Sequence, residues 1–366
     1  MSKIAIFLTA LDGGGAEKVM LNLAKGFVKS GLKVDLLLVK STGAYVSQIP
    51  PEIELIDLKQ DRLLTSIPSL INYLKTEQPQ ALLTALDTNV IAAWLRRWSS
   101  ISIRTIVTVH NNLSLESRHG EGIKRKLTAK FAGWFYGWAD SIVAVSEGVA
   151  ADLIEIGLPK QKINVVYNPI VDDELKTKLR QPLEHRWLQD GQLPVILGVG
   201  RLTKQKNFIT LIQAFAIVRD RIPARLMILG EGEDRADLES AIEQLGLESD
   251  VLLLGFVDNP YQYMFQAAVL VMSSVWEGFG NVLVEAMAAG TPVVSTNCPS
   301  GPAEILADGE YGKMVSVGDV EEMAKNIEIT LRSPPNVEKL KHRAKTFSLD
   351  NATKSYLEIL EVKLTL

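Results

Sequence analysis

Short apolar runs alternate with helical patterns along almost the whole chain, and this alternation restricts the possible folds more than any other feature. Runs rich in Ile, Leu and Val are typical of strands buried on both faces of a parallel sheet. Between them, apolar residues recur at helical spacing, as in a helix predicted over 16–30 that stops near Gly31. The pattern predicts a parallel α/β fold. The predicted strands are 3–8, 33–39, 81–85, 104–109, 141–145 and 163–166, then 194–199, 225–229, 251–254, 269–272, 292–296 and 313–317.

The length of 366 residues fits two domains of ordinary size. A polar, charged stretch over 172–193, interrupted by Pro182 and Gly191, separates the two series of strands, so the domain boundary is expected there. The tail has apolar residues at helical spacing. We predict an N-terminal Rossmann-like domain over 1–185, a C-terminal Rossmann-like domain over 186–347 and a final helix over 348–366.

Cysteine content and apolar patterning indicate a cytoplasmic protein. The single cysteine, Cys298, excludes a disulfide framework and fits a reducing compartment. The first residues, KIAIFLTAL, lack a strongly basic leader and run into a glycine loop, so a buried first strand is expected rather than a secretion signal. No apolar run reaches the ~18 residues that indicate a membrane span.

The segment from Glu277 to Val294, EGFGNVLVEAMAAGTPVV, combines two carboxylates with a helix predicted over 281–289. Glycines at the start of that helix expose backbone amides, and such a helix N-terminus binds anions such as phosphate. Glu277 and Glu285 flank these amides and are better suited to accept hydrogen bonds from hydroxyl groups. A ligand with both phosphate and hydroxyl groups, a sugar nucleotide, fits this segment. Stabilisation of the helix dipole is the alternative for Glu285, but it explains one glutamate only.

Two cations, Arg201 and Lys206, occur in GVGRLTKQKN directly after a predicted strand. Ligands bind at the carboxyl ends of strands in an open parallel sheet. A guanidinium fork and a lysine point charge at such a place are suited to a diphosphate, and solvated loop charges are the alternative. Two further strand ends, at 230–232 and 255–257, are expected at the rim, the second of them beside a uracil-type base.

The loop from Thr9 to Gly15 joins the first strand to the first helix and contains three consecutive glycines. Such glycines let backbone amides approach an anion closely, and a plain tight turn is the alternative. The dinucleotide-binding pattern G-x-G-x-x-G is not present, and Asp35 begins the second strand rather than ending it. The sequence also lacks a Walker-type GxxxxGK[ST], which disfavours nucleoside triphosphate hydrolysis.

Together these motifs resemble the retaining glycosyltransferases of family 4, with their Glu-x7-Glu pattern. The resemblance covers nearly the whole chain, because family-like segments follow in the expected order. It implies the GT-B fold, in which two Rossmann-like doubly wound domains face each other across a cleft and the last helix crosses back onto the first domain. The segments are GGGAEKV at 13–19, TVH ending at His110, AVSEGVAADL at 144–153, VVYNPI at 165–170, GVGRLTKQKN at 198–207 and SGPAEIL at 300–306.

The resemblance also implies roles for individual residues. Arg201 and Lys206 would bind the donor diphosphate, with Glu285 on the ribose. Glu277 and His110 would lie at the donor sugar, although a lone histidine is more often structural. The implied catalytic residues are His110, Arg201, Lys206 and Glu277. The implied donor-binding residues are Gly14, Gly15, Arg201, Lys206, Glu231, Phe256, Glu277, Phe279, Gly280, Asn281, Val282 and Glu285. The implied acceptor or cleft residues are Glu17, His110, Asn111, Ser146, Glu147 and Asn168, with core or capping roles as the alternative for the last three.

No metal cofactor is expected. The four histidines show no metal-ligand spacing, and no Asp-x-Asp follows a predicted strand. Protein cations replace the metal in the enzymes that the chain resembles, and a UDP-sugar is the expected donor substrate.

Residues 94–138 combine basic and aromatic side chains. Their aromatic residues share a helical stripe, for which core packing is the simplest interpretation. Trp and Tyr beside Lys and Arg are also typical of a helix at a membrane surface. Residues 1–180 hold 22 Lys and Arg against 18 Asp and Glu, while the rest hold 17 against 25. We therefore expect contact with an anionic membrane through Lys124, Arg125, Lys126 and Lys130. The net charge of −4 and the lack of a recognition module disfavour nucleic acid.

The sequence thus predicts a retaining hexosyltransferase that moves a sugar from a nucleotide-diphosphate sugar to a glycan or polyprenyl-diphosphate-linked acceptor. The expected donor is a UDP-hexose or UDP-N-acetylhexosamine, and the expected location is the cytoplasmic face of the inner membrane. Two alternatives stay open. One is a sugar-nucleotide epimerase of the same fold, and the other is a non-catalytic protein that binds nucleotide sugars.

Overall fold

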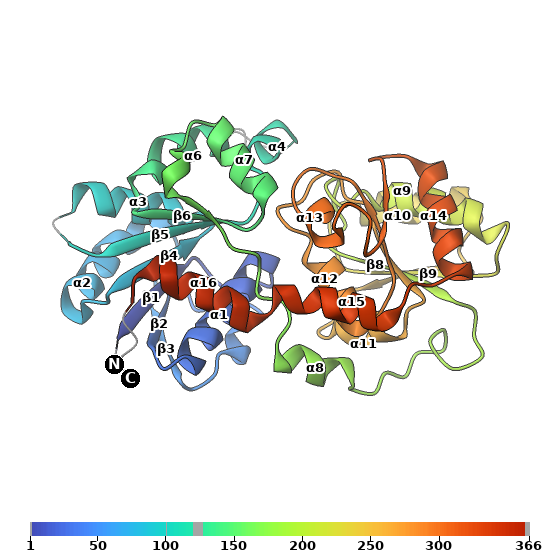
Figure 1. The fold of residues 1–366 in the computed structure, drawn as a ribbon, viewed down its shortest axis with the longest axis horizontal. Coiled ribbons are helices and arrows are strands. Elements are labelled where there is room, and N and C mark those ends of the chain that lie inside the picture. Colours follow the sequence, from blue (N-terminus) through green and yellow to red (C-terminus); the bar gives the residue numbers. More distant parts are fainter. Residues whose placement is uncertain (1, 100, 120–126, 363–366) are drawn as a thin grey trace. The chain divides into compact units, whose positions relative to one another are not determined.

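The structure is a computed structural model that describes residues 2–99, 101–119 and 127–362. It contains two compact units, each built on one β-sheet with helices packed around it (Figure 1). The first unit comprises Met1–Pro169 and Leu349–Leu366, and the second comprises Ile170–Ser348.

The first unit is built on a seven-stranded parallel sheet. Its strands are β1 (Lys3–Leu8), β2 (Lys33–Leu38), β3 (Ile53–Asp57), β4 (Ala81–Ala85), β5 (Arg104–Val109), β6 (Ser141–Ala144) and β7 (Ile163–Val165). They are ordered β3-β2-β1-β4-β5-β6-β7, so the first strand lies between the second and the fourth. The strands β2 and β3 lie on one side of β1, and β4 to β7 lie on the other. The point at which the strand order reverses is the topological switch point of the sheet, and ligands bind there at the carboxyl ends of the strands.

The sequence predicts six of these seven strands and misses β3. This strand forms one edge of the sheet and buries only Ile53, while Glu54, Leu55 and Asp57 are exposed. It therefore lacks the continuous apolar run by which a strand covered on both faces is recognised.

Helices and short 3-10 turns cover this sheet. The helices are α1 (Gly15–Lys29), α2 (Ile67–Glu77), α3 (Thr88–Trp98), α4 (Leu113–His119), α6 (Thr128–Phe135), α7 (Glu147–Glu155) and α16 (Leu349–Leu360). The turns are η1 (Val46–Gln48), η2 (Leu63–Ser66), η3 (Tyr136–Trp138) and η4 (Lys160–Lys162). Because the residues of β1 after Lys3 are all buried, helices must pack on both faces of the sheet.

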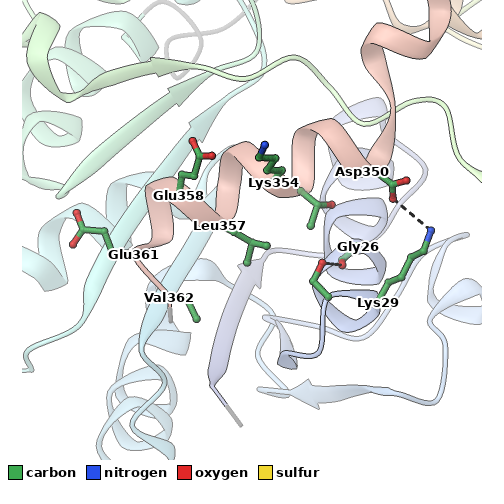
Figure 2. Close-up of a pocket in the computed structure, with 10 residues that line it drawn as sticks. Gly26, Lys29, Asp350, Lys354, Leu357, Glu358, Glu361 and Val362 are labelled. Carbon is green, nitrogen blue, oxygen red and sulfur yellow. Dashed lines mark hydrogen bonds and ion pairs between the residues drawn. The ribbon is translucent and has the colours of Figure 1, made fainter. Parts of the chain in front are cut away.

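The last helix, α16, lies beside α1 within the first unit (Figure 2). A Cβ atom on Gly26 would lie 2.2 Å from the Thr353 hydroxyl, so glycine allows the two helices to approach closely. Lys29 and Asp350 form an ion pair of 3.4 Å, and a pocket of about 620 Å³ opens along the two helices. The Thr353 hydroxyl is buried without a hydrogen-bond partner in the described part of the chain.

The second unit has a six-stranded parallel sheet. Its strands are β8 (Val195–Val199), β9 (Arg225–Leu229), β10 (Val251–Gly255), β11 (Val269–Met272), β12 (Val293–Thr296) and β13 (Lys313–Val315), ordered β10-β9-β8-β11-β12-β13. Its helices are α8 (Asp173–Leu179), α9 (Phe208–Arg219), α10 (Arg235–Gln244), α11 (Pro260–Gln266), α12 (Asn281–Ala289), α13 (Pro302–Leu306), α14 (Val320–Arg332), α15 (Val337–Ala344) and the 3-10 turn η5 (Lys345–Phe347). The switch point lies between β8 and β11. The predicted α/β class with two Rossmann-like domains is confirmed.

The second unit begins at Ile170, upstream of the boundary expected at 185. Helix α8, which lies in the intervening stretch, packs against α11, where Asn259 donates a side-chain hydrogen bond to the Lys178 carbonyl at 3.0 Å. The amide of Ile170 donates to the Phe347 carbonyl at 3.0 Å, which joins the first and last segments of this unit. In the described part of the chain no helix has the length and apolarity needed to cross a bilayer.

Candidate functional site

Three loops interlock at the carboxyl ends of β8, β9 and β10. The amide of Gly200 donates to the Leu229 carbonyl at 3.0 Å, and the amide of Gly230 donates to the Gly255 carbonyl at 2.8 Å. A Cβ atom on Gly230 would lie only 1.9 Å from the Gly200 carbonyl oxygen, and the φ of Gly230 is +139°. Only glycine fits such a close backbone approach. The loops are therefore held rigidly at the edge of the sheet where ligands bind.

Lys206 and Glu277 meet across the switch point of the second unit. Lys206 follows β8 and Glu277 follows β11, and Lys206 Nζ lies 2.5 Å from Glu277 Oε1. Both side chains are largely buried, with 18% and 8% of their surfaces exposed. The Ser274 hydroxyl donates to the same carboxylate oxygen at 2.6 Å. Two residues with separate predicted ligands are thus a single ion pair in this structure.

Backbone contacts fix this pair. The amide of Val275 donates to the Gln205 carbonyl at 2.8 Å, and the Gln205 side chain donates to the Trp276 carbonyl at 2.9 Å. The Ser273 hydroxyl donates to the Lys206 carbonyl at 2.7 Å. Because the loops after β8 and β11 are tied along their length, Lys206 is a preorganised cation. The sequence pattern does not single out these supporting residues, although serines directly after a buried strand are a usable signal.

Cys298 lies in the same region and is not a nucleophile. Burial raises the pKa of its thiol to about 12, and the nearby carboxylate of Glu277 adds to the rise. The thiol is therefore protonated at neutral pH, and it packs as a small apolar side chain.

Helix α12 begins beside the pair with glycine in a left-handed conformation. Gly280 has φ +102° and precedes Asn281, the first residue of the helix. Phe279 is 2% exposed, and its ring packs edge-on against Phe347 at 5.4 Å. A Cβ atom on Gly301 would lie 1.9 Å from the Phe279 carbonyl oxygen. The helix start predicted to bind phosphate is thus held by close backbone packing, and its positive dipole end is fixed in place.

Glu285 lies in the second turn of α12 and is half-buried. It accepts a hydrogen bond of 3.4 Å from the Tyr261 hydroxyl, which comes from α11. A carboxylate that already accepts from one hydroxyl group is chemically suited to accept from a ribose. The aromatic partner Tyr261 has no motif of its own and is not found from the sequence.

The remaining donor-side residues are more exposed. Arg201 is exposed, and its guanidinium forms no ion pair within the described residues. Glu231 accepts from Arg235 at 2.6 Å, beside the end of β10. Phe256 follows β10 and is 60% exposed. An exposed phenyl ring and a free guanidinium are groups that a nucleotide base and a phosphate would cover.

In the first unit, the triple-glycine loop already binds an anion from its own chain. The carboxylate of Glu17 accepts from the amides of Gly13 at 2.9 Å and Gly14 at 3.2 Å through the same oxygen, Oε2. Gly15 begins α1, and the Tyr45 hydroxyl donates to the Gly13 carbonyl at 3.1 Å. The loop that was expected to approach donor phosphates through Gly14 and Gly15 has two of its amides engaged by Glu17.

His110 directly follows β5 and has a neutral imidazole. The Thr108 hydroxyl donates to the Thr84 carbonyl at 2.8 Å, so it accepts from His110 Nε2, 3.0 Å away. His110 Nδ1 is then an acceptor, and it is buried without a partner among the described residues. Burial lowers the pKa of His110 to about 4, so the ring is uncharged at neutral pH. Its unsatisfied nitrogen is ready to accept from a ligand hydroxyl.

The other predicted cleft residues have structural contacts. Ser146 caps α7, since its hydroxyl oxygen accepts from the Val149 amide at 3.1 Å. Asn111 donates to Glu116 at 3.4 Å. Glu147 is exposed in the first turn of α7, and Asn168 is buried near the end of the unit.

Of the predicted membrane contacts, Lys130 is exposed on α6, whereas Lys124, Arg125 and Lys126 lie outside the described residues. The described residues contain no cluster of His, Cys, Asp and Glu that could hold a metal ion.

Comparison with known proteins identifies the family. The profile "Glycosyltransferase Family 4" matches residues 13–174, and "Glycosyl transferases group 1" matches residues 180–347. A Campylobacter jejuni protein, N-acetylgalactosamine-N,N'-diacetylbacillosaminyl-diphospho-undecaprenol 4-alpha-N-acetylgalactosaminyltransferase, is 31% identical over an alignment 360 residues long that covers 94% of each chain. The chain belongs to the family 4 glycosyltransferases. As a hexosyltransferase it falls in the enzyme class that the sequence predicts.

Solved structures of glycosyltransferases share the fold of this enzyme. The apo form of the lipopolysaccharide outer core galactosyltransferase WaaB superposes with a TM-score of 0.75 at 22% identity, over 100% of both chains. HepE of Anabaena in complex with UDP and glucose gives a TM-score of 0.77 at 21% identity, over 99% of this chain and 100% of the other. The predicted GT-B fold is therefore confirmed.

Proposed function

We propose that this glycosyltransferase moves a hexose or N-acetylhexosamine from a UDP-sugar to a glycan or polyprenyl-diphosphate-linked acceptor at the cytoplasmic face of the inner membrane. The Lys206–Glu277 pair is the main support for the proposal. It places a cation beside a carboxylate that can accept hydrogen bonds from sugar hydroxyls, at the topological switch point of the sheet. The names of two similar proteins support the proposed donor and acceptor. HepE was solved with UDP and glucose, and the Campylobacter relative is named for a diphospho-undecaprenol substrate.

Three groups would stabilise the donor diphosphate: the unpaired guanidinium of Arg201, the ammonium of Lys206 and the first amides of α12. When the bond between sugar and phosphate breaks, negative charge grows on the leaving diphosphate, and fixed charges and dipoles stabilise it. As Lys206 turns toward phosphate, Glu277 becomes available to the sugar hydroxyls. Glu285 would bind the ribose and Phe256 the base. Protein cations thus take the place of a metal ion.

Retention of the anomeric configuration would follow from attack on one face. The acceptor oxygen bonds to the anomeric carbon on the side from which the diphosphate leaves, and the departing phosphate oxygen takes the proton of the acceptor hydroxyl. His110, neutral and with an open Nδ1, would accept from a sugar hydroxyl near the reacting carbon. Glu17, held by two amides through Oε2, would present Oε1 to the acceptor together with Asn111 and Asn168.

A donor screen with mass analysis of the product tests the proposal. Purified enzyme should release UDP only when a UDP-sugar and a glycolipid acceptor are both present, and chelation with EDTA should leave the rate unchanged. Glu285→Ala should weaken UDP binding in calorimetry by about tenfold or more, as expected for loss of a charged hydrogen bond. The exposed Glu243→Ala on α10 is the matched control. Conversion of a UDP-sugar without acceptor would establish an epimerase instead, and binding without turnover would establish a non-catalytic protein.

A further inference from the structure

The exposed tryptophans of the described chain lie together on two helices of the first unit, α3 and α6, which pack against each other (Figure 1). Trp98 is 63% exposed, Trp134 is 57% exposed and Trp94 is 38% exposed, with Phe131 at 39% beside them. The two tryptophans of the second unit are buried. Large aromatic side chains gathered on one face indicate a surface that binds a partner.

The exposed rings contact two half-buried aromatic side chains, Phe135 and Trp138. Trp98 contacts Trp138 edge-on at 6.5 Å, and Trp138 contacts Phe135 at 4.9 Å. Phe131 continues the row from Phe135 at 6.2 Å to Trp134 at 6.0 Å. Core packing and exposure therefore coexist on this stripe. Because the inner rings hold the outer ones, little side-chain freedom remains to be lost on binding.

The charges of this face have one sign. The guanidinium of Arg97 lies 4.8 Å from the ring of Trp98, and the ammonium of Lys130 lies 5.1 Å from the ring of Trp134. Residues 88–98 and 128–138 contain no Asp or Glu. The third cation, Arg96, forms an ion pair with Asp140 at 2.7 Å. The positive charges of Arg97 and Lys130 are therefore not balanced by an acidic residue of these two segments.

From this arrangement we infer that Trp94, Arg97, Trp98, Lys130, Phe131 and Trp134, here the tryptophan surface, dock on an anionic phospholipid bilayer. Indole rings settle at the boundary between headgroups and acyl chains, and Lys and Arg beside them bind the anionic headgroups. A second copy of the chain fits less well, because a two-fold contact would oppose surfaces of the same charge. The inference rests on the proposed function only in that a lipid-linked acceptor requires the enzyme to reach the membrane.

Flotation with lipid vesicles tests the surface directly. The purified full chain is mixed with vesicles of phosphatidylcholine alone or with phosphatidylglycerol added. Arg97→Gln and Lys130→Gln should each reduce partitioning onto anionic vesicles by about fivefold, as expected for one cation near a charged surface. Trp98→Ala with Trp134→Ala should reduce partitioning further and decrease the blue shift of tryptophan emission, of which Trp94 would keep a part. The controls are Leu64→Ala, with 71% exposure elsewhere on the unit, and the exposed Lys75→Gln.

Each outcome decides the inference. Equal flotation of wild type and the surface variants overturns it, and so does equal binding to neutral and anionic vesicles. If the tryptophan variants instead lower the mass of the protein in sedimentation equilibrium, the surface is a contact between copies of the chain. Calorimetry with UDP separates this result from the proposed function. The surface variants should bind UDP like wild type, whereas loss of UDP binding by the wild type would remove the function and leave docking intact.

Discussion

Removal of the Lys206 ammonium should affect folding and catalysis by different amounts. Lys206→Met keeps the length of the side chain and leaves the buried Glu277 carboxylate with the Ser274 hydroxyl as the remaining contact of its Oε1 atom. A buried charge that loses its partner costs about 3–5 kcal/mol of unfolding free energy. Loss of a cation that stabilises the leaving group should raise the barrier by about 2–4 kcal/mol, which lowers kcat/KM by about 30-fold to 1000-fold.

The double variant Lys206→Met/Glu277→Gln separates the two effects. It removes both charges, and the glutamine can still accept from Ser274. Most of the lost unfolding free energy should return in the double variant, since the penalty in the single variant is that of an isolated buried charge. The rate should not return, because neither the cation nor the carboxylate is restored.

Urea unfolding and a coupled assay of UDP release measure the two quantities. Lys204→Met, at an exposed lysine of the same loop, is the matched control and should change the unfolding free energy by less than about 0.5 kcal/mol. If the double variant is no more stable than Lys206→Met, the pair is not coupled in solution and the reasoning from the geometry fails. Wild-type kcat/KM in Lys206→Met would remove Lys206 from the diphosphate site.

Three further predictions follow from single positions. Burial lowers the pKa of His110 to about 4, so as pH falls from 6.5 to 4 the unfolded chain takes up a proton that the folded chain does not. Stability should fall across that window by up to about 3 kcal/mol, and His110→Gln should remove this part of the slope in urea titrations at each pH. Gly230→Ala places a methyl group against a backbone oxygen and should cost about 3 kcal/mol or more, whereas Gly246→Ala, at φ +65° in open space, should cost about 1 kcal/mol by the same measurement. Gly26→Ala pushes a methyl group against the buried threonine hydroxyl of α16 and should cost about 1–3 kcal/mol, with faster amide exchange in that helix as the readout.

Strands that are covered on both faces consist of continuous apolar runs. The sequence pattern therefore predicts β1, β8 and their buried neighbours. The edge strand β3 has solvent on part of its surface and therefore mixes Glu and Asp with its apolar residues. Helix ends follow from local chemistry, as at Gly31, but the end of a domain does not. Helix α8 belongs to the second unit because of a contact with Asn259, 81 residues from its partner in the chain.

The residues of the second unit that are proposed to bind the donor could be found for a similar reason. Loops that follow successive strands of a parallel sheet share one edge, so Lys206 and Glu277 are expected near each other once the strands are assigned. Their direct pairing could not be predicted, because it depends on side-chain reach across the switch point and on the Ser274 hydroxyl. Tyr261 and Phe347 support the site from helices that carry no motif, and only the folded chain brings them there.

In the glycine loop of the first unit, the structure differs from what the sequence pattern predicts. Three glycines expose amides, and exposed amides bind an anion, so the loop is a reasonable place to expect phosphate. The anion is already in the chain, since Glu17 lies three residues after Gly14 and its carboxylate reaches back to the amides of Gly13 and Gly14. An acid three residues into a helix is the capping-box pattern, and its presence in GGGAEKV was the available signal. A carboxylate fixed in this way repels phosphate and attracts hydroxyl groups. This geometry favours the proposed assignment, in which the first unit binds the sugar acceptor and the cations and helix start of the second bind phosphate.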